Sequence, residues 1–199
     1  MNPELKLLFP SVVQIYDVPE HQSLDARMLD AVASVRAEIP NSKPRSWACD
    51  VYTTIGVPDA VLGHPTFDEF LTIAHENVVA FATALKLDVE RQPPRIHECW
   101  INAYASDQSQ EIHLHRNSVF SGIYYLQVPD GSGATLFYSP SADVMLEPPA
   151  TEGDALNAKV TGFVPQAGRM LVFRSHLRHS VMPGCIEGER ISIAFNAIM

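Results

Sequence analysis

Three histidines are the side chains of this sequence best suited to bind a metal ion. His113 and His115 flank Leu114, and side chains at positions i and i+2 of a β-strand share a face, so both imidazoles would point the same way. His179 lies where an apolar run ends. Three neutral imidazoles suit Fe(II), Zn(II) or Cu(II). The pair alone is more often a satisfied polar surface, so the predicted metal site depends on His179, with His176 as the competing candidate.

An arginine and a serine further along the chain are candidates for binding an anion. Arg190 opens an alternating segment in which Arg190, Ser192 and Asn196 would share one face of a strand. An arginine beside a hydroxyl group would bind a carboxylate, with the arginine forming a bidentate, charge-assisted pair. The alternative is a surface ion pair between Arg190 and Glu187 or Glu189. Alternation alone leaves both interpretations open.

Short strands must position these side chains. The second half of the chain has runs of β-branched and aromatic residues separated by Gly, Pro and Asp, and Ile112 and Leu114 are expected to face apolar packing. These runs predict strands at 96–104, 111–115, 119–128, 134–138, 159–164, 169–174, 179–182 and 190–198, with a hairpin turn at 129–133. Many short strands in succession are typical of a sandwich or barrel such as a jelly roll. The long connection 139–157 could cover an opening.

The first half of the chain predicts helices that support this sheet structure. An edge strand is expected within residues 5–18 and a short strand at 51–54. Ser23 is expected to cap a helix that ends before Pro40, and Thr66 to Glu69 fits a capping box for a second helix. We expect both helices to pack on the outer face of one sheet. The expected fold class is α+β, mostly β, in one domain of residues 1–199, with 1–95 as support and 96–199 as the metal-binding core.

Composition restricts the partners. The chain has 199 residues and a net charge of −9, which opposes a phosphate-binding surface, so no nucleic-acid partner is expected. Three scattered cysteines and the absence of a signal-like start or a long apolar stretch predict a cytoplasmic protein with no membrane partner. A homodimer is the default expectation for self-association.

The order of these motifs resembles that of the Fe(II)- and 2-oxoglutarate-dependent oxygenases, which have the double-stranded β-helix fold. The closest resemblance is to a bacterial and phage group of that family, and it covers residues 96–199. The motifs that carry it are His113-Leu114-His115, Ser121-Gly122-Ile123-Tyr124-Tyr125-Leu126, His179-Ser180-Val181 and Arg190-Ile191-Ser192-Ile193-Ala194-Phe195-Asn196. Upstream, Asn102-Ala103-Tyr104 resembles the Asn-x-Tyr of nucleic-acid alkylation-repair dioxygenases, where both side chains help bind 2-oxoglutarate.

The resemblance implies a metal site with one departure from the family pattern. Most of these oxygenases have Asp or Glu at the position of His115, which here implies three histidine ligands: His113, His115 and His179. The alternative is that Glu111 or Asp107 binds the metal and that one of the histidines contacts a ligand without binding the metal itself.

The resemblance also implies a cosubstrate site and a reaction. Arg190 and Ser192 would bind the distal carboxylate of 2-oxoglutarate, and the other candidates for its pocket are Asn102, Tyr104, Asn196 and one of Tyr124 and Tyr125. Trp100 is expected to belong to the core. With Fe(II), 2-oxoglutarate and O2, the implied reaction yields succinate and CO2 and hydroxylates a C–H bond of a small-molecule substrate. The alternative is a cupin-like β-helix protein that binds a metal or small ligand without catalysis.

Overall fold

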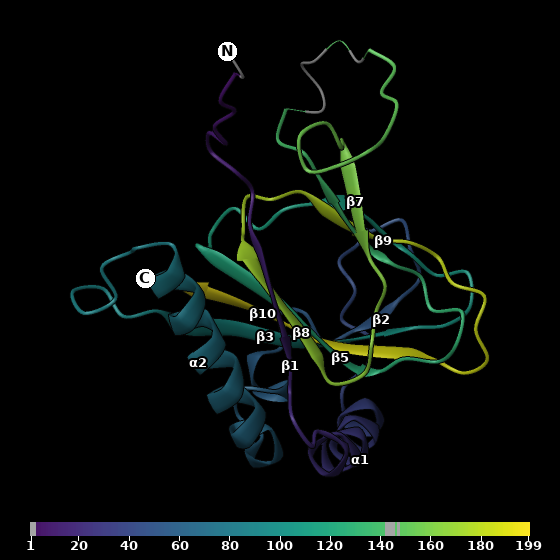
Figure 1. The fold of residues 1–199 in the computed structure, drawn as a ribbon. Helices are drawn as coiled ribbons and strands as arrows, with labels where there is room; N and C mark the ends of the chain where they lie inside the picture. The colour runs from purple at the N-terminus through teal and green to yellow at the C-terminus, as the bar shows by residue number, and fades with distance from the viewer. Residues whose placement is uncertain (1–2, 142–145, 147) are drawn as a thin grey trace.

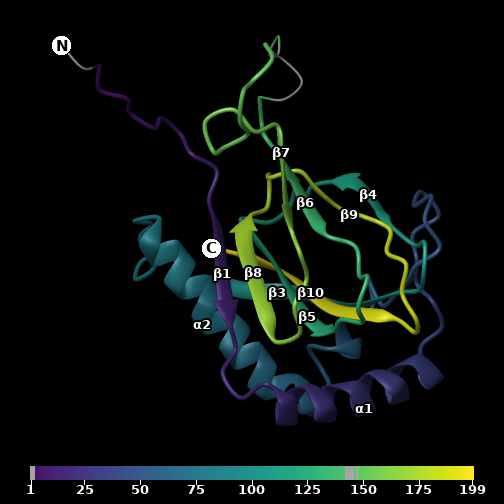
Figure 2. The same cartoon turned by 45° about the vertical axis from the view of Figure 1, so that its right-hand side comes forward.

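Two antiparallel sheets form the centre of the protein (Figure 1). The structure, a computed structural model, describes residues 3–141, 146 and 148–199. The larger sheet has six strands in the order β1-β8-β5-β10-β3-β2, and the smaller has four in the order β4-β9-β6-β7. Both helices lie against one face of the larger sheet (Figure 2). This arrangement confirms the predicted mostly β, double-stranded β-helix fold.

The predicted strands of the second half are all present, each with ends within two residues of those expected. The larger sheet consists of β1 (Val13–Asp17), β2 (Tyr52–Thr53), β3 (Arg95–Tyr104), β5 (Phe120–Gln127), β8 (Arg169–Arg174) and β10 (Arg190–Ile198). The smaller sheet consists of β4 (Gln110–His113), β6 (Thr135–Tyr138), β7 (Val160–Phe163) and β9 (His179–Val181). The edge strand expected within residues 5–18 is β1, which pairs with β8.

Two helices cover the outer face of the larger sheet, as predicted. They are α1 (Gln22–Glu38) and α2 (Asp68–Ala84), and two short 3-10 turns, Pro58–Ala60 and Pro65–Phe67, precede α2. Apolar residues at helical spacing, such as Met28 of α1 and Phe70 of α2, are buried in one cluster with the outward side chains of the sheet. The inner face of the larger sheet is therefore left to the site. No helix in the described part of the chain is long and apolar enough to cross a membrane.

The predicted helix caps are wrong. The residue before α1 is His21, and its ring contacts the carboxylate of Asp25 at 2.5 Å rather than a backbone N–H, while Ser23 lies inside the helix. Thr66 lies in the 3-10 turn before α2, where its N–H donates to Nδ1 of His64. In both cases the contacts of neighbouring histidines replace the local capping pattern.

The predicted hairpin at 129–133 is also wrong. Strand β5 pairs with β8 and β10, so both of its edges are occupied, and β6 pairs with β7 and β9 in the other sheet. Residues 129–133 therefore cross from one sheet to the other. Local turn chemistry indicated a turn correctly, but it carries no information about which strands pair.

Alternation along β5 separates the outer core from the interior. Tyr124 faces the helices, where its hydroxyl donates to Oδ1 of Asp25 at 2.5 Å. Tyr125 lies between the sheets and donates to Oγ1 of Thr135 at 2.8 Å. Side chains that share the direction of Tyr125 therefore face the candidate site.

Of the connection 139–157, residues 142–145 and 147 lie outside the described residues. The described parts of this connection line a groove together with the N-terminal segment, and none of them lines the cavity beside the histidines.

Candidate metal centre and cosubstrate cavity

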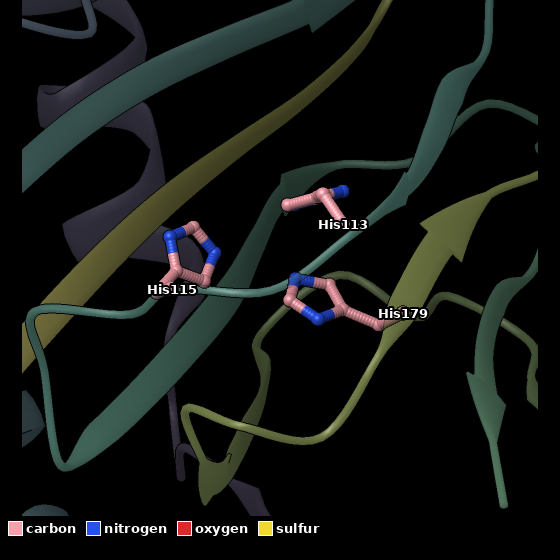
Figure 3. A group of neighbouring side chains, drawn as sticks. All are labelled: His113, His115 and His179. Atoms are coloured by element: carbon pink, nitrogen blue, oxygen red, sulfur yellow. The ribbon is translucent and has the colours of Figure 1, made fainter. Parts of the chain in front are cut away.

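The three predicted histidines come together between the sheets (Figure 3). One ring nitrogen from each of His113, His115 and His179 lies within 4.8 Å of the others. Strands β4 and β9 pair antiparallel with His113 directly opposite His179, which brings together side chains that are far apart in the sequence. Among the described residues, no other group of three or more His, Cys, Asp and Glu residues is close enough to share a metal ion.

His115 reaches this group from a loop rather than from a strand. Strand β4 ends at His113, two residues earlier than predicted, and the backbone N–H of His115 donates to the carbonyl of Ser175 at 3.0 Å. Ile112 is 55% exposed instead of facing apolar packing, because β4 is the edge strand of the smaller sheet. The two-residue periodicity therefore does not explain why His113 and His115 face the same space.

Backbone carbonyls set the tautomer of two of the imidazoles. Nδ1 of His113 lies 2.7 Å from the carbonyl oxygen of Glu111, and Nδ1 of His179 lies 3.0 Å from that of Leu177. A carbonyl oxygen only accepts, so each Nδ1 carries the proton and each Nε2 keeps a free electron pair. This is the usual arrangement of metal-binding histidines.

Burial favours the neutral form of all three imidazoles. Burial lowers the pKa of His113 and lowers that of His179 well below its ordinary value, with the charge of His113 adding to the effect at His179. Burial, together with the charge of His113, lowers the pKa of His115 to about 4. Because a metal binds only the deprotonated imidazole, no proton has to be removed before these rings bind a metal.

Asn196 lies behind His115 and does not line the cavity. Its Nδ2 lies 3.4 Å from Nδ1 of His115 and donates to Oε2 of Glu98 at 2.7 Å. Its Oδ1 accepts from the hydroxyl of Ser121 at 2.7 Å. The residue predicted for the cosubstrate pocket is thus placed where it holds the third histidine in position.

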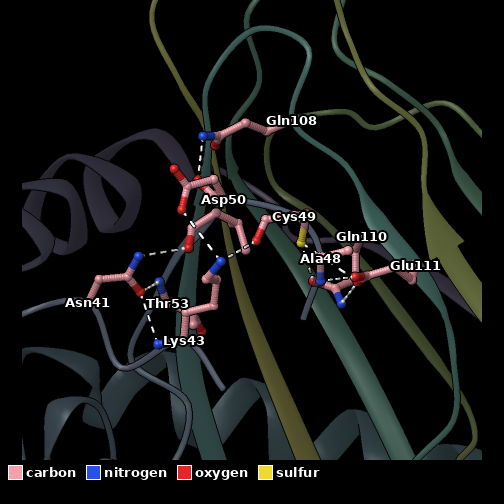
Figure 4. Close-up of polar contacts among 10 residues, drawn as sticks. Asn41, Lys43, Ala48, Cys49, Asp50, Thr53, Gln108, Gln110 and Glu111 are labelled. Carbon is pink, nitrogen blue, oxygen red and sulfur yellow. Dashed lines mark hydrogen bonds and ion pairs between the residues drawn. The ribbon is translucent and has the colours of Figure 1, made fainter. Parts of the chain in front are cut away.

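The carboxylate of Glu111 does not belong to the group of metal-binding side chains. It accepts the backbone N–H of Ala48, the thiol of Cys49 at 3.7 Å and the amide of Gln110 at 2.9 Å (Figure 4). Burial by itself raises the pKa of Glu111, but backbone N–H groups, including those of Ala48 and Cys49, hold it below the ordinary value. The contacts of Glu111 with Ala48 and Cys49 anchor the segment 41–50. Asp107, the other carboxylate considered from the sequence, is exposed in the turn after β3.

Arg190 is a buried cation without a carboxylate partner among the described residues. It is 2% exposed, and its guanidinium lies 5.4 Å from the ring centre of Tyr104 and 5.1 Å from that of Tyr125. It donates to the carbonyl of Gly133 at 2.9 Å and to Oγ1 of Thr135 at 3.3 Å. The surface ion pair considered from the sequence is therefore not formed. A buried charge without an opposite charge is costly, so the site is suited to an anionic ligand.

Three residues that line the cavity with the histidines each have a buried polar atom without a hydrogen-bond partner in the described chain. The atoms are Nε1 of Trp100, Oδ1 of Asn102 and Nε of Arg190. Buried polar atoms are almost always paired, so a group of unpaired atoms on residues that line one cavity indicates a bound molecule. Two of these atoms, Nε of Arg190 and Nε1 of Trp100, can donate hydrogen bonds to the oxygens of a dicarboxylate, whereas Oδ1 of Asn102 is an acceptor and needs a different donor, such as water. The residues present therefore fit 2-oxoglutarate, and the three imidazoles fit Fe(II).

The structure brings most of the predicted site residues to this cavity. Its lining includes the three histidines together with Asn102, Tyr104, Arg190 and Ser192. Tyr125 contacts Arg190 from behind, and His176 is exposed.

Sequence reasoning missed Trp47, Gln110 and Trp100, which also line the cavity. Trp100 could have been found, because it lies two residues before Asn102 on the same strand and so shares its face. Trp47 comes from an irregular segment without any periodic signal.

Comparison with known proteins agrees with this geometry. The family model described as "Putative 2OG-Fe(II) oxygenase" matches residues 98–196, which contain the three histidines and Arg190. No curated protein is similar enough to the chain to count as a match.

Solved structures share the fold at low sequence identity. A prolyl-4-hydroxylase from Pseudomonas putida is 15% identical with a TM-score of 0.64, and the match covers 94% of this chain and 92% of that one. A viral collagen prolyl hydroxylase from Paramecium bursaria Chlorella virus-1 is 16% identical with a TM-score of 0.58, covering 93% and 94%. HygX from Streptomyces hygroscopicus, solved with nickel and 2-oxoglutarate, is 14% identical with a TM-score of 0.59, covering 94% and 82%.

The matched segment and the fold lead to the same conclusion. The chain belongs to the family of Fe(II)- and 2-oxoglutarate-dependent oxygenases.

Proposed function

We propose that this oxygenase binds Fe(II) through His113, His115 and His179, binds the distal carboxylate of 2-oxoglutarate through Arg190, and hydroxylates a C–H bond of a small molecule. The observation that carries the proposal is the buried, carboxylate-free guanidinium of Arg190 in the cavity beside the histidines. A cation buried in this way gains most from an anionic ligand that enters the cavity.

His113 and His179 contribute Nε2 atoms that are ready to bind a metal. The carbonyls of Glu111 and Leu177 keep the protons of His113 and His179 on Nδ1, and Asn196 fixes the ring of His115. Bound Fe(II), together with 2-oxoglutarate and O2, supplies the oxidising power for C–H hydroxylation, with succinate and CO2 as coproducts. The protein supplies the placement of these groups.

Arg190 contributes a fixed positive charge. The carbonyl of Gly133 and the hydroxyl of Thr135 orient the guanidinium. Tyr125 supports this arrangement, because its ring packs against Arg190 and its hydroxyl donates to Thr135. Ser192 lines the cavity on the same face of β10, two residues further along. A carboxylate bound here would exchange water for a charge-assisted hydrogen bond in a buried site.

The cavity walls contribute water exclusion. Apart from the polar residues already described, the lining is largely apolar and includes Ile123, Phe173, Val181 and Ala194. Apolar walls around the reacting centre limit side reactions with water.

A small-molecule substrate has a precedent among known structures of similar fold, and so does a peptide substrate. HygX has been solved with hygromycin B bound, whereas a prolyl hydroxylase from Trichoplax adhaerens has been solved with a peptide fragment. The net charge of −9 disfavours a nucleic-acid substrate. Three unpaired cysteines support a cytoplasmic location, and a homodimer remains our proposal for self-association. Cell fractionation and light scattering test these two statements.

The central experiment measures uncoupled turnover of 2-oxoglutarate. Purified protein with Fe(II) under air should form succinate, and His179→Ala should abolish both succinate formation and metal binding. Arg190→Ala should raise the KM for 2-oxoglutarate by about a hundredfold or more while metal binding persists. His176→Ala is the matched control, because His176 is exposed and should leave both unchanged. Absence of turnover and of 2-oxoglutarate binding in the unmodified protein would overturn the proposal.

A further inference from the structure

Trp100 lines the cosubstrate cavity, and its indole N–H is a buried donor without a partner in the described chain. Trp100 is 5% exposed, its Nε1 has no hydrogen-bond partner in the described chain, and its side chain lines the cavity. Packing alone does not account for this residue, because a buried donor without a partner is a cost that an apolar side chain would avoid. The N–H therefore indicates a partner that the described residues do not supply.

Trp100 lies at the metal end of the cavity. Its ring centre is 5.7 Å from that of His115. On the neighbouring strand β10 the residue directly opposite is Ala194, which presents only a methyl group beside the large indole. No described residue places an acceptor within hydrogen-bond distance of the N–H.

In the register of β3 and β10, Trp100 and Arg190, the residues with unpaired donors, lie apart along the direction of the strands. Trp100 lies opposite Ala194, and Arg190 lies opposite Tyr104, four residues further along β3. At a rise of about 3.3 Å per residue, these pairs are about 13 Å apart along the strand. The side chains on this face converge on the cavity, so a ligand held at one end by Arg190 extends toward His115 and Trp100.

We propose that the indole N–H of Trp100 donates a hydrogen bond to an oxygen at the keto-acid end of 2-oxoglutarate. This inference rests on the proposed binding of the distal carboxylate by Arg190. With that carboxylate at Arg190, the remaining oxygens of the molecule lie at the end of the cavity that contains Trp100. The unpaired donors then bind opposite ends of the same molecule, and Trp100 becomes a cosubstrate-binding residue rather than a core residue.

The experiment removes the N–H and measures binding of 2-oxoglutarate by isothermal titration calorimetry on Mn(II)-loaded protein without oxygen. Trp100→Phe deletes the donor together with part of the ring. Incorporation of 3-benzothienylalanine at position 100 keeps the two-ring shape and replaces the N–H with sulfur. Both variants should bind 2-oxoglutarate about ten- to a hundredfold more weakly, because a hydrogen bond to a charged oxygen is lost. The affinity for Mn(II) should stay within about twofold of the unmodified protein.

Tyr124→Phe is the matched control from the other face of the same sheet. It deletes the hydrogen bond from Tyr124 to Asp25, so it should lower the Tm and leave the Kd for 2-oxoglutarate unchanged. The benzothienyl variant should show a different pattern, with a Tm that is unchanged or higher and a weaker Kd, since the missing N–H has no partner among the described residues and leaving it buried is a cost.

The outcomes separate this inference from the proposed function. If the unmodified protein does not bind 2-oxoglutarate, the proposed function fails. If it binds, and Arg190→Ala weakens binding while both Trp100 variants bind as tightly as the unmodified protein, only the role of Trp100 is overturned. A lower Tm of the benzothienyl variant with an unchanged Kd would also overturn it, because the N–H would then serve the fold.

Discussion

Gly122 provides the sharpest test of how the larger sheet packs against the helices. It lies on β5 directly opposite Phe195 of β10, and a Cβ at this position would lie 2.0 Å from Cζ of the Phe195 ring. Phe195 is 1% exposed and packs edge-on against Phe70 of α2, with 6.4 Å between ring centres. The ring therefore lies between the backbone of Gly122 and the helix.

The expected cost of Gly122→Ala follows from this distance. Carbon atoms make their best contact at about 3.5–4.0 Å, so the ring must move by about 1.5–2 Å toward α2. Overpacking of this kind costs about 1–3 kcal/mol, and the size of the movement favours the upper end of this range. At about 2–4 °C per kcal/mol for a chain of this length, the Tm should fall by about 6–12 °C.

The assay is thermal unfolding with a double-mutant cycle. Phe195→Leu shortens the ring side chain, so Gly122→Ala should cost about 1 kcal/mol less in that background than alone. Gly153→Ala is the control, because a Cβ there would meet no atom within 4 Å, and its Tm should stay within about 1–2 °C of the unmodified value. A fall of less than about 2 °C for Gly122→Ala, or strictly additive effects in the cycle, would refute the reasoning.

Three further predictions concern the site. The metal-free protein should lose stability as the pH falls from about 6.5 to 4, because His115 is protonated in the unfolded state over this range but stays neutral in the folded state, where its pKa is about 4. Urea unfolding in the presence of a chelator should show that His115→Gln reduces this loss of stability by up to about 3 kcal/mol, whereas His176→Gln, at an exposed position, should not change it. Asn196→Ala should weaken metal binding about tenfold in a chelator competition, and unchanged affinity would show that its contact with His115 is incidental. Glu111→Ala should speed cleavage by trypsin after Arg45, because its carboxylate no longer anchors segment 41–50; equal rates would contradict that anchoring.

The sequence by itself determined the local features of the fold. Alternation in runs such as 190–198 predicted the strands and which of their side chains share a face, because side-chain direction in a strand depends only on position. Helical spacing of apolar residues likewise predicted α1 and α2 and their packing on one face of a sheet. The ordered histidines and Arg190 indicated the family, which the match to residues 98–196 bears out.

Only the tertiary structure decided which segments meet. The pairing that sets His113 opposite His179, and the crossing of residues 129–133 between sheets, depend on contacts between distant parts of the chain that no local period encodes. His115 reaches the site from a loop, where its N–H donates to the carbonyl of Ser175. The prediction that His115 lies beside His113 was therefore correct, but the strand alternation on which it was based does not extend to His115.

The same limit applies to polar partners. Whether Arg190 forms a surface ion pair or stays buried without a carboxylate depends on the whole environment of its side chain, and so does the unpaired N–H of Trp100. Residue type determines which hydrogen bonds a side chain can form, and spacing indicates which side chains share a face. Burial, which only the folded chain defines, decides which of them are missing, and at this site the missing bonds indicate where the ligand belongs.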